Sequence, residues 1–313
     1  MQKYTVKTMD KKILFIYNPR AGKGRIKNTL SEIIEEFNEN SFEVITYATK
    51  QREDATNIVI ECLRKEEYEY VVCSGGDGTL SEVINGVMKY SKKPKIGYIP
   101  AGTTNDCAYS LKLSNNLVKA AKGIMVNNIF QWDIGSFNEK YFVYNAAFGL
   151  FTDTAYHTPQ SVKNILGKSA YFLEGIKSIT SCKPCKMEIH YGDTTISAEF
   201  IYGMITNSFS IGGFKGLAGK NVCLDDGKFE GIFIKKPGSI IELQKTISDL
   251  RKGSLNSEFI VSLPVTDIYI TSDEPVPWGL DGEFGGNLKE VTIKNHKQQI
   301  SIAAPLENIN YFA

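Results

Sequence analysis

The most distinctive chemistry in the sequence lies in a loop with three glycines, SGGDGT, from Ser74 to Thr79. Because glycine has no Cβ, its backbone N–H can approach a phosphate oxygen closely, and a helix start favours anions. The loop therefore has the features of a phosphate site, but such a site leaves the negative charge of Asp77 unexplained. The alternative to a phosphate site is a plain turn between a strand and a helix. Neither common phosphate-loop fingerprint, GxGxxG or GxxxxGK[ST], occurs in the chain.

Two further loops combine small or basic residues with polar ones. NPRAGKGR, from Asn18 to Arg25, brings Lys23 to a turn flanked by glycines, and PAGTTND, from Pro100 to Asp106, ends on a carboxylate. Taken singly, the first loop is explained as well by a solvated basic turn as by a binding site. The second loop is explained equally well by an Asx-type turn. Each follows a strand-like segment, as SGGDGT does, so one shared polar site is more plausible than three coincidences.

Two Asp-Gly pairs occur late in the chain. Asp281 and Glu283 lie in WGLDGEFGG, and Asp226 lies in VCLDDGKFE. Asp-Gly is a strong signal for a tight turn between strands. On the residues alone, a hairpin turn is a better interpretation of the first pair than a functional carboxylate. The second pair poses the same choice, since it is also compatible with a simple turn between strands.

Strand-like and helical segments alternate along the first third of the chain. KILFIYN and YEYVVCSG are short apolar runs, and the segment 22–40 has helical periodicity. Its apolar residues are Ile26, Leu30, Ile33, Ile34 and Phe37. This alternation predicts an α/β domain with a mostly parallel sheet covered by helices, in which ligands bind beyond the carboxyl ends of the strands. The three loops stand at those ends.

After about Trp132 the pattern changes to strand-type alternation separated by Gly, Asp and Asn turns. It predicts a β-rich antiparallel second domain, with helices near 160–180 and 238–252. We therefore expect an α/β nucleotide-binding domain at 1–134 and a β-rich domain at 135–303. A C-terminal tail, 304–313, is expected to pack back on the first domain.

The amino-acid composition of the chain argues against several classes of function. The 36 basic and 35 acidic residues leave a formal charge of +1, which gives no support for a nucleic-acid partner. There is no apolar run of the length that crosses a membrane and no leader-like start, so a cytoplasmic protein is expected. The six cysteines are expected to be free thiols, and the CKPC pair, Cys182 and Cys185, lacks a second half for zinc.

In their order and spacing, these motifs resemble the bacterial soluble diacylglycerol kinases and the YegS-like lipid kinases. The resemblance covers nearly the whole chain and rests on NPRAGKG, GGDGTLSEVING, IPAGTTND, TPQSVKNILGKSAYFLEGIK, LDDGKF and LDGEFGG. GGDGT alone is shared with NAD kinases and phosphofructokinases, whereas its combination with GTTND and the late DGE is specific. The resemblance implies an ATP-dependent lipid kinase with its active site in a cleft between two domains.

The resemblance also implies residue roles. Lys23 would bridge Asp77 and Asp106 and leave charge for the Mg²⁺ of Mg-ATP, because a buried carboxylate is costly unless it is paired. ATP would lie on Asn18, Pro19, Arg20, Ala21, Gly22, Thr49, Gly75, Gly76, Asp77, Gly78, Thr79, Leu80, Ser81, Glu82 and Thr103.

In the second domain, the resemblance makes Asp281 the proton acceptor for the lipid hydroxyl, with Glu283 beside it. A structural Mg²⁺ would be held by the side chain of Asp226 and by main-chain oxygens of Cys223 and Lys228. The sequence departs modestly from the family, with Ala21 where a serine is common and Tyr109 where an arginine is common. Kinase activity is still expected in spite of these departures, but they make the identity of the substrate less secure.

The lipid itself is expected to meet the segment 160–180, whose apolar residues and lysines suit acyl chains and an anionic bilayer surface. On the pattern alone, a core-facing helix is the better interpretation of this segment. Diacylglycerol, giving phosphatidic acid, is the expected acceptor. The alternatives are a sphingoid base or a glycolipid, a NAD-kinase-like enzyme with a soluble acceptor, and a nucleotide-responsive module without turnover. Peripheral membrane contact and a homodimer are expected by resemblance only.

Overall fold

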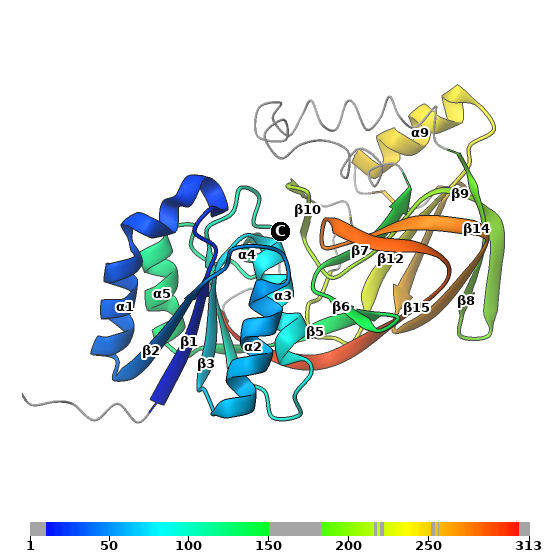
Figure 1. Ribbon diagram of the computed structural model, residues 1–313. Coiled ribbons are helices and arrows are strands. Elements are labelled where there is room, and N and C mark those ends of the chain that lie inside the picture. The colour runs from blue at the N-terminus through cyan, green and yellow to red at the C-terminus, as the bar shows by residue number, and fades with distance from the viewer. Residues whose placement is uncertain are drawn as a thin grey trace, which may run out of the picture. The chain divides into compact units, whose positions relative to one another are not determined.

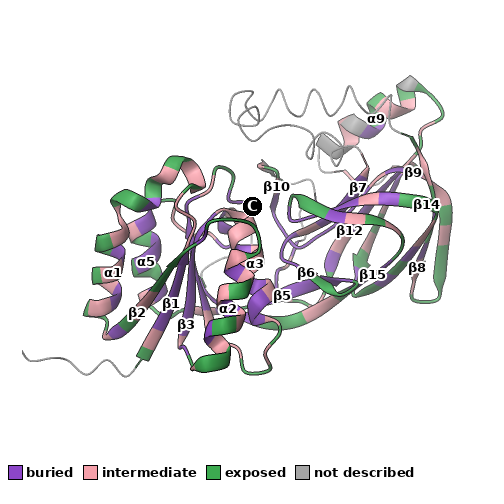
Figure 2. Cartoon of the chain, in the orientation of Figure 1, coloured by how far each residue is buried: buried purple, intermediate pink, exposed green. Residues whose placement is uncertain are grey.

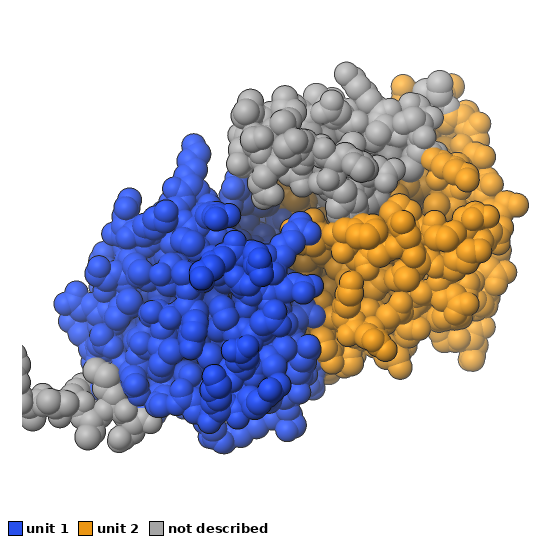
Figure 3. All heavy atoms as spheres, in the orientation of Figure 1, with its two compact units in different colours: residues 1–132, 299–309 blue, residues 133–298, 310–313 orange. Residues whose placement is uncertain are grey.

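The computed structural model describes residues 11–149, 183–215, 218–219, 222–251, 254–255 and 257–306. Contacts divide the chain into two compact units (Figure 3). Unit 1 comprises residues up to Trp132 together with 299–309, and unit 2 comprises Asp133–Gln298 with the last residues of the chain. The helix predicted near 160–180, with its suggested lipid contact, lies outside the described residues.

Unit 1 is a parallel sheet with helices on both faces. Its strands β1 (Lys11–Tyr17), β2 (Phe42–Ala48), β3 (Tyr70–Gly75) and β4 (Lys95–Pro100) run in the order β4-β3-β1-β2, each pair being parallel. Figure 2 shows β1 and β3 buried along most of their length, as continuous apolar runs require.

The helices of unit 1 flank this sheet (Figure 1). They are α1 (Leu30–Glu39), α2 (Asp54–Lys65), α3 (Asp77–Val87), the short α4 (Asp106–Ser110) and α5 (Leu117–Met125). The helices α1 and α5 contact each other, as do α2 and α3, and the two pairs cover opposite faces of the sheet in Figure 1. Helical residues such as Ile33 and Phe37 are completely buried because their spacing points them to the sheet.

The structure differs from the sequence prediction at the first helix. The predicted helical segment 22–40 is broken: η1 (Ala21–Asn28) is a kinked 3-10 segment, and regular helix begins only at Leu30. Within η1, Gly22, Lys23 and Gly24 have positive φ angles of 50°, 65° and 77°. Left-handed residues cannot continue a right-handed helix, so this stretch forms a loop at the end of β1.

Unit 2 is an antiparallel sheet in the order β13-β12-β9-β7-β14-β15, with β8 pairing with β14 and β9. Its strands are β6 (Lys140–Phe142), β7 (Asn145–Gly149), β8 (Cys185–Tyr191), β9 (Thr194–Thr206), β12 (Phe229–Lys235), β13 (Ile260–Val265), β14 (Asp267–Leu280) and β15 (Glu283–Ala303), with a small pair β10 (Ser210–Ile211) and β11 (Phe214–Lys215). The helix α9 (Ile240–Arg251) occupies the predicted segment 238–252.

Phe148, Trp278 and Phe233 are at the centre of one aromatic-rich core on this sheet. Side chains alternate between the two faces of a strand, so the residues next to these core positions point to the other face. Two strands, β5 (Ile129–Phe137) and β15, each contribute residues to both units.

Candidate active site

In unit 1, the three loops predicted to form one site lie together at the carboxyl ends of β1, β3 and β4. The backbone N–H of Asn18 donates to the carbonyl of Ser74 at 2.8 Å, and that of Ala101 donates to Gly75 at 2.8 Å. Parallel strands in register deliver their carboxyl ends to one edge of the sheet, so the convergence follows from the strand order.

Two glycines are required where these loops cross. A Cβ on Gly22 would lie 2.0 Å from the carbonyl oxygen of Ala101, and one on Gly102 would lie 2.6 Å from the Cα of Gly76. Gly78 is different, because a Cβ there would have no atom within 4 Å. Packing therefore explains Gly22 and Gly102, whereas Gly78 borders open space at the first turn of α3.

The carboxylate of Asp77 is held by the start of α4. Its Oδ2 accepts the backbone N–H of Asp106 at 2.9 Å, and its Oδ1 accepts that of Cys107 at 3.1 Å. Burial raises the pKa of Asp77 to about 6, and the charge of Asp106 adds to the shift. Asp106 is itself only 2% exposed. Two carboxylates that disfavour each other's charge suit a bound cation, which fits the chemistry of Mg-ATP.

Lys23 does not bridge these carboxylates in the structure, contrary to the sequence prediction. It is exposed, and none of the ion pairs in the described residues joins it to Asp77 or Asp106. The physical reason is local, because Lys23 lies in the left-handed stretch after β1 while backbone N–H groups satisfy Asp77.

Several other predicted nucleotide residues have structural partners. Leu80 is fully buried, and the carboxylate of Glu82 accepts the backbone N–H groups of Glu53 and Ala55 at 3.0 and 3.1 Å, beside the start of α2. Burial raises the pKa of Glu82. Thr49 is 8% exposed and follows β2, where its N–H donates to Tyr17. Burial or hydrogen bonds within unit 1 therefore account for all three residues.

The remaining predicted residues line the same loops. The side-chain oxygen of Asn18 accepts the N–H of Arg20 at 2.9 Å and so shapes the turn. The half-buried or exposed members of the set are Pro19, Arg20, Ala21, Gly76, Thr79, Ser81 and Thr103, and Gly75 is buried at the end of β3.

In unit 2, Asp281 is buried and tightly fixed. It is 5% exposed, has a φ of 50° and follows the last residue of β14. Its carboxylate accepts the backbone N–H groups of Val143, Tyr144 and Asn145 at 2.8, 3.0 and 3.1 Å. In return, its own N–H donates to the carbonyl of Asn145 at 2.8 Å. These bonds hold the carboxylate of Asp281 in one orientation. Glu283, which begins β15, is exposed.

The loop predicted to hold a structural Mg²⁺ is organised by another carboxylate. Asp133 accepts the backbone N–H groups of Gly227 and Gln298 at 2.6 and 2.7 Å. Asp226 is exposed, and its Oδ1 accepts the N–H of Lys228 at 2.8 Å. Within the described part of the chain, no group of three or more His, Cys, Asp or Glu residues could hold a metal ion. A metal on Cys223, Asp226 and Lys228 therefore stays a prediction.

Sequence reasoning did not single out two residues on unit 2. Asn145 and Glu230 each have a buried side-chain oxygen, Oδ1 and Oε2, that finds no hydrogen-bond partner in the described part of the chain. Burial raises the pKa of Glu230 to about 8. No local motif marks either residue, because only the strand pairing described below connects them with Asp281.

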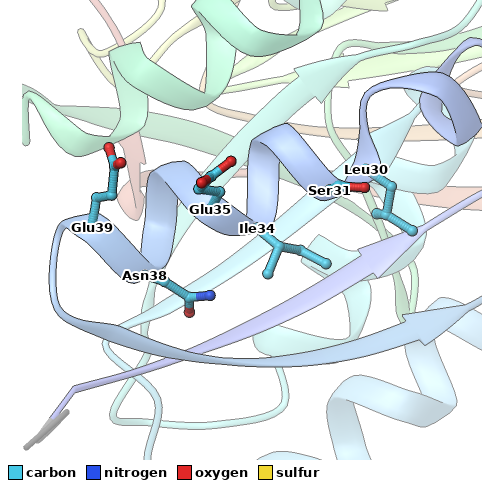
Figure 4. A pocket seen from close by; sticks show the side chains of 6 residues that line it. All are labelled: Leu30, Ser31, Ile34, Glu35, Asn38 and Glu39. Atoms are coloured by element: carbon cyan, nitrogen blue, oxygen red, sulfur yellow. The ribbon is translucent and has the colours of Figure 1, made fainter. Parts of the chain in front are cut away.

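A shallow hollow of about 570 Å³ lies along α1 (Figure 4). It is lined by Leu30, Ser31, Ile34, Glu35, Asn38 and Glu39. None of the predicted site residues lines it, so it is separate from the loops described above. None of the described helices is long and apolar enough to span a bilayer.

Comparison with known proteins gives consistent matches. The family model described as "Diacylglycerol kinase catalytic domain" matches residues 12–137. A diacylglycerol kinase of Bacillus subtilis is 31% identical over 298 residues, covering 95% of this chain and 97% of that protein. One of Staphylococcus carnosus is 33% identical over 300 residues, covering 95% and 96%. A crystal structure described as a putative diacylglycerol kinase from Bacillus anthracis superposes with a TM-score of 0.81 at 25% identity and covers 98% of both chains.

Proposed function

The chain belongs to the family of bacterial diacylglycerol kinases, and we propose that it transfers the γ-phosphoryl group of ATP to the free hydroxyl of a diacylglycerol, giving phosphatidic acid. The supporting observation is Asp281, a buried carboxylate that three backbone N–H groups fix in one orientation. Phosphoryl transfer depends mainly on positioning and electrostatics, and both require such pre-organised groups.

Asp281 acts as the proton acceptor in this proposal. Hydrogen bonds from N–H groups favour the charged form of a carboxylate, so Asp281 is ready to orient a hydroxyl. The lipid oxygen attacks the γ-phosphorus, the bond from that phosphorus to the bridging oxygen breaks, and ADP leaves. The hydroxyl proton passes to the carboxylate, which makes Asp281 the general base.

The loops of unit 1 bind the nucleotide in this proposal. Gly78 leaves room for a phosphate at the start of α3, and a helix N-terminus favours anions. Asp77 and Asp106 would hold a Mg²⁺ that comes with ATP, directly or through water, and that ion neutralises phosphate charge when bound. Lys23, exposed in the first loop, is available to contact phosphate.

A transfer assay tests the acceptor. Purified protein is incubated with radiolabelled ATP and micelles of diacylglycerol, a sphingoid base or a glycolipid, and separately with NAD. We expect labelled phosphatidic acid and no labelled product from the Asp281→Asn protein, which controls for contaminating kinases. If the label appears in another lipid or in NAD, that molecule is the acceptor and diacylglycerol is not. ATP binding without any transfer would favour a non-catalytic module.

Access to a bilayer lipid implies peripheral membrane contact, which we propose together with a homodimer as properties of the working enzyme. Sedimentation with vesicles that contain diacylglycerol measures the first, and light scattering of the purified protein measures the second. Absence of the protein from the vesicle pellet at low salt would contradict the membrane contact.

A further inference from the structure

A row of side chains runs across the sheet of unit 2 from the position of Asp281. Asn145 on β7 is opposite Thr206 on β9, and Thr206 is opposite Glu230 on β12. Their sequence neighbours Ala146, Ile205 and Phe229 all belong to the aromatic-rich core. Because side chains alternate, the row of Asn145, Thr206 and Glu230 points to the other face of the sheet.

Asp281 joins one end of this row. Its N–H donates to the carbonyl of Asn145, and its Oδ1 accepts the N–H of Asn145, so the two residues are direct neighbours. Neighbouring strands lie about 4.8 Å apart, so Glu230 is only about 10 Å from Asn145 across the sheet. The proposed general base therefore adjoins a short polar strip.

Two members of this polar row have a side-chain oxygen that no described residue satisfies. The Thr206 hydroxyl donates to the carbonyl of Tyr144 at 2.6 Å. In contrast, Asn145 Oδ1 and Glu230 Oε2 are buried and have no hydrogen-bond partner among the described residues. A buried polar group without a partner lowers stability, and an apolar replacement would remove that cost. A ligand that supplies the missing hydrogen bonds is one explanation of such groups.

The next positions on the same face are apolar. Ala147 pairs with Met204, and Met204 pairs with Ile232. All three are buried, and none of them belongs to the aromatic-rich core on the other face. A polar row beside an apolar row matches an amphiphile, in which the polar groups lie next to the acyl chains.

We propose that Asn145 and Glu230 are positioning residues for the polar backbone of the acceptor lipid, and that they select a hydroxyl flanked by further oxygens over the hydroxyl of a simple long-chain alcohol. The inference rests on the proposed lipid kinase function and adds a subsite to it. Asp281 treats both kinds of hydroxyl alike, so discrimination must come from groups beside it, and the polar row lies there.

Kinetics of Glu230→Leu with diacylglycerol micelles test the subsite. Loss of one hydrogen bond to the lipid should raise KM for diacylglycerol about tenfold, while KM for ATP stays unchanged. The melting temperature should stay the same or rise, because an unpartnered carboxyl is removed from the interior. Glu230→Gln, which keeps hydrogen-bonding capacity, should restore KM to within about threefold.

A second assay compares diacylglycerol with a long-chain alcohol as acceptor. The ratio of the two kcat/KM values should fall about tenfold in Glu230→Leu and in Asn145→Leu, because both acceptors still reach Asp281. Glu258→Gln, at an exposed position of unit 2, is the matched control and should leave the ratio unchanged.

The outcomes separate this inference from the function on which it rests. If wild-type protein does not phosphorylate diacylglycerol, the proposed function and the subsite both fail. If wild-type protein is active but the variants keep its KM and acceptor ratio, only the subsite is refuted. A fall in melting temperature with equal changes in both KM values would assign Glu230 a merely structural role and would also refute it.

Discussion

Asp77 and Asp281 are held by the same device, backbone N–H groups at the end of a strand or the start of a helix. Asp77 receives two such bonds from α4, and Asp281 receives three from residues 143–145. The difference lies in their neighbours, because burial and then the charge of a second carboxylate, Asp106, raise the pKa of Asp77. In the proposed function, Asp77 serves a cation and Asp281 accepts a proton.

The first prediction at the residue scale concerns Asp281→Asn. Turnover should fall by about 10²–10⁴-fold, because the amide cannot accept the proton, while the dissociation constant of ATP stays within about twofold. The variant keeps the shape of the side chain but turns an NH₂ group toward backbone N–H donors, so a lower melting temperature is also expected.

Asp267→Asn is the matched control for that variant, since Asp267 is exposed at the start of β14. Its turnover should equal that of the wild type. A rate for Asp281→Asn within about threefold of the wild-type rate would rule out Asp281 as the base.

The second residue-scale prediction concerns pH and Asp77. Its pKa is about 6 in the folded protein, against about 3.9 in an unfolded chain, so between these values the folded state binds more protons. The free energy of unfolding of the metal-free protein should therefore fall as pH rises from about 4 to about 6, and this contribution should be constant above that range.

Chemical unfolding of wild-type protein and Asp77→Asn across this pH range measures the effect. The difference between the two free energies should change with pH only in that window, since the other titrating groups are common to both proteins. Parallel curves would show that Asp77 titrates normally in the fold.

At the element scale, the three loops work as one packed unit. The strand ends of β1, β3 and β4 bring them together, and the glycines Gly22 and Gly102 allow backbone to touch backbone. Gly78 is the exception, because nothing in the described protein occupies the space that its Cβ would take. Packing therefore does not require a glycine at this position, which the proposed phosphate site would.

Gly78→Ala and Gly22→Ala separate these two roles. In Gly78→Ala the melting temperature should rise slightly, because alanine is a better helix former than glycine, yet the affinity for Mg-ATP should fall about tenfold or more. In Gly22→Ala the melting temperature should fall, because the new Cβ meets the carbonyl of Ala101 in a backbone with positive φ. Thermal scans and nucleotide titration measure both, and unchanged ATP affinity in Gly78→Ala would refute a phosphate at this turn.

At the scale of the whole molecule, the chain leaves unit 1 through β5 and returns through β15. The last residues of β15 lie beside β4 and complete the sheet of unit 1. The two strands are parallel, and Ile302 on β15 pairs with Ile96 on β4. Ile300 and Ile302 are fully buried. The stability of unit 1 therefore depends on residues nearly at the other end of the sequence.

Ile302→Ala tests this dependence. Removal of a fully buried isoleucine side chain from a core should lower the free energy of unfolding by about 2–4 kcal/mol. Ile241→Ala, at a position 78% exposed on α9, should change it by less than about 0.5 kcal/mol. Denaturant titration measures both, and equal effects would show that β15 adds little to unit 1.

The sequence by itself determined the alternation of strands and helices, the three loops at the strand ends, and the family. These follow from local periodicity and from motifs of adjacent residues, which a single chain displays directly. It also marked Asp77, Asp106 and Asp281 by type and spacing, with the resemblance supplying their roles.

Only the tertiary structure decided how these groups are partnered. None of the ion pairs in the described residues joins Lys23 to Asp77 or Asp106. Glu82 holds the start of α2, and the donors to Asp281 come from residues far away in sequence. The row of Asn145, Thr206 and Glu230 exists only through strand register. The physical reason is that hydrogen-bond partners and burial depend on contacts between distant segments, which no local pattern encodes.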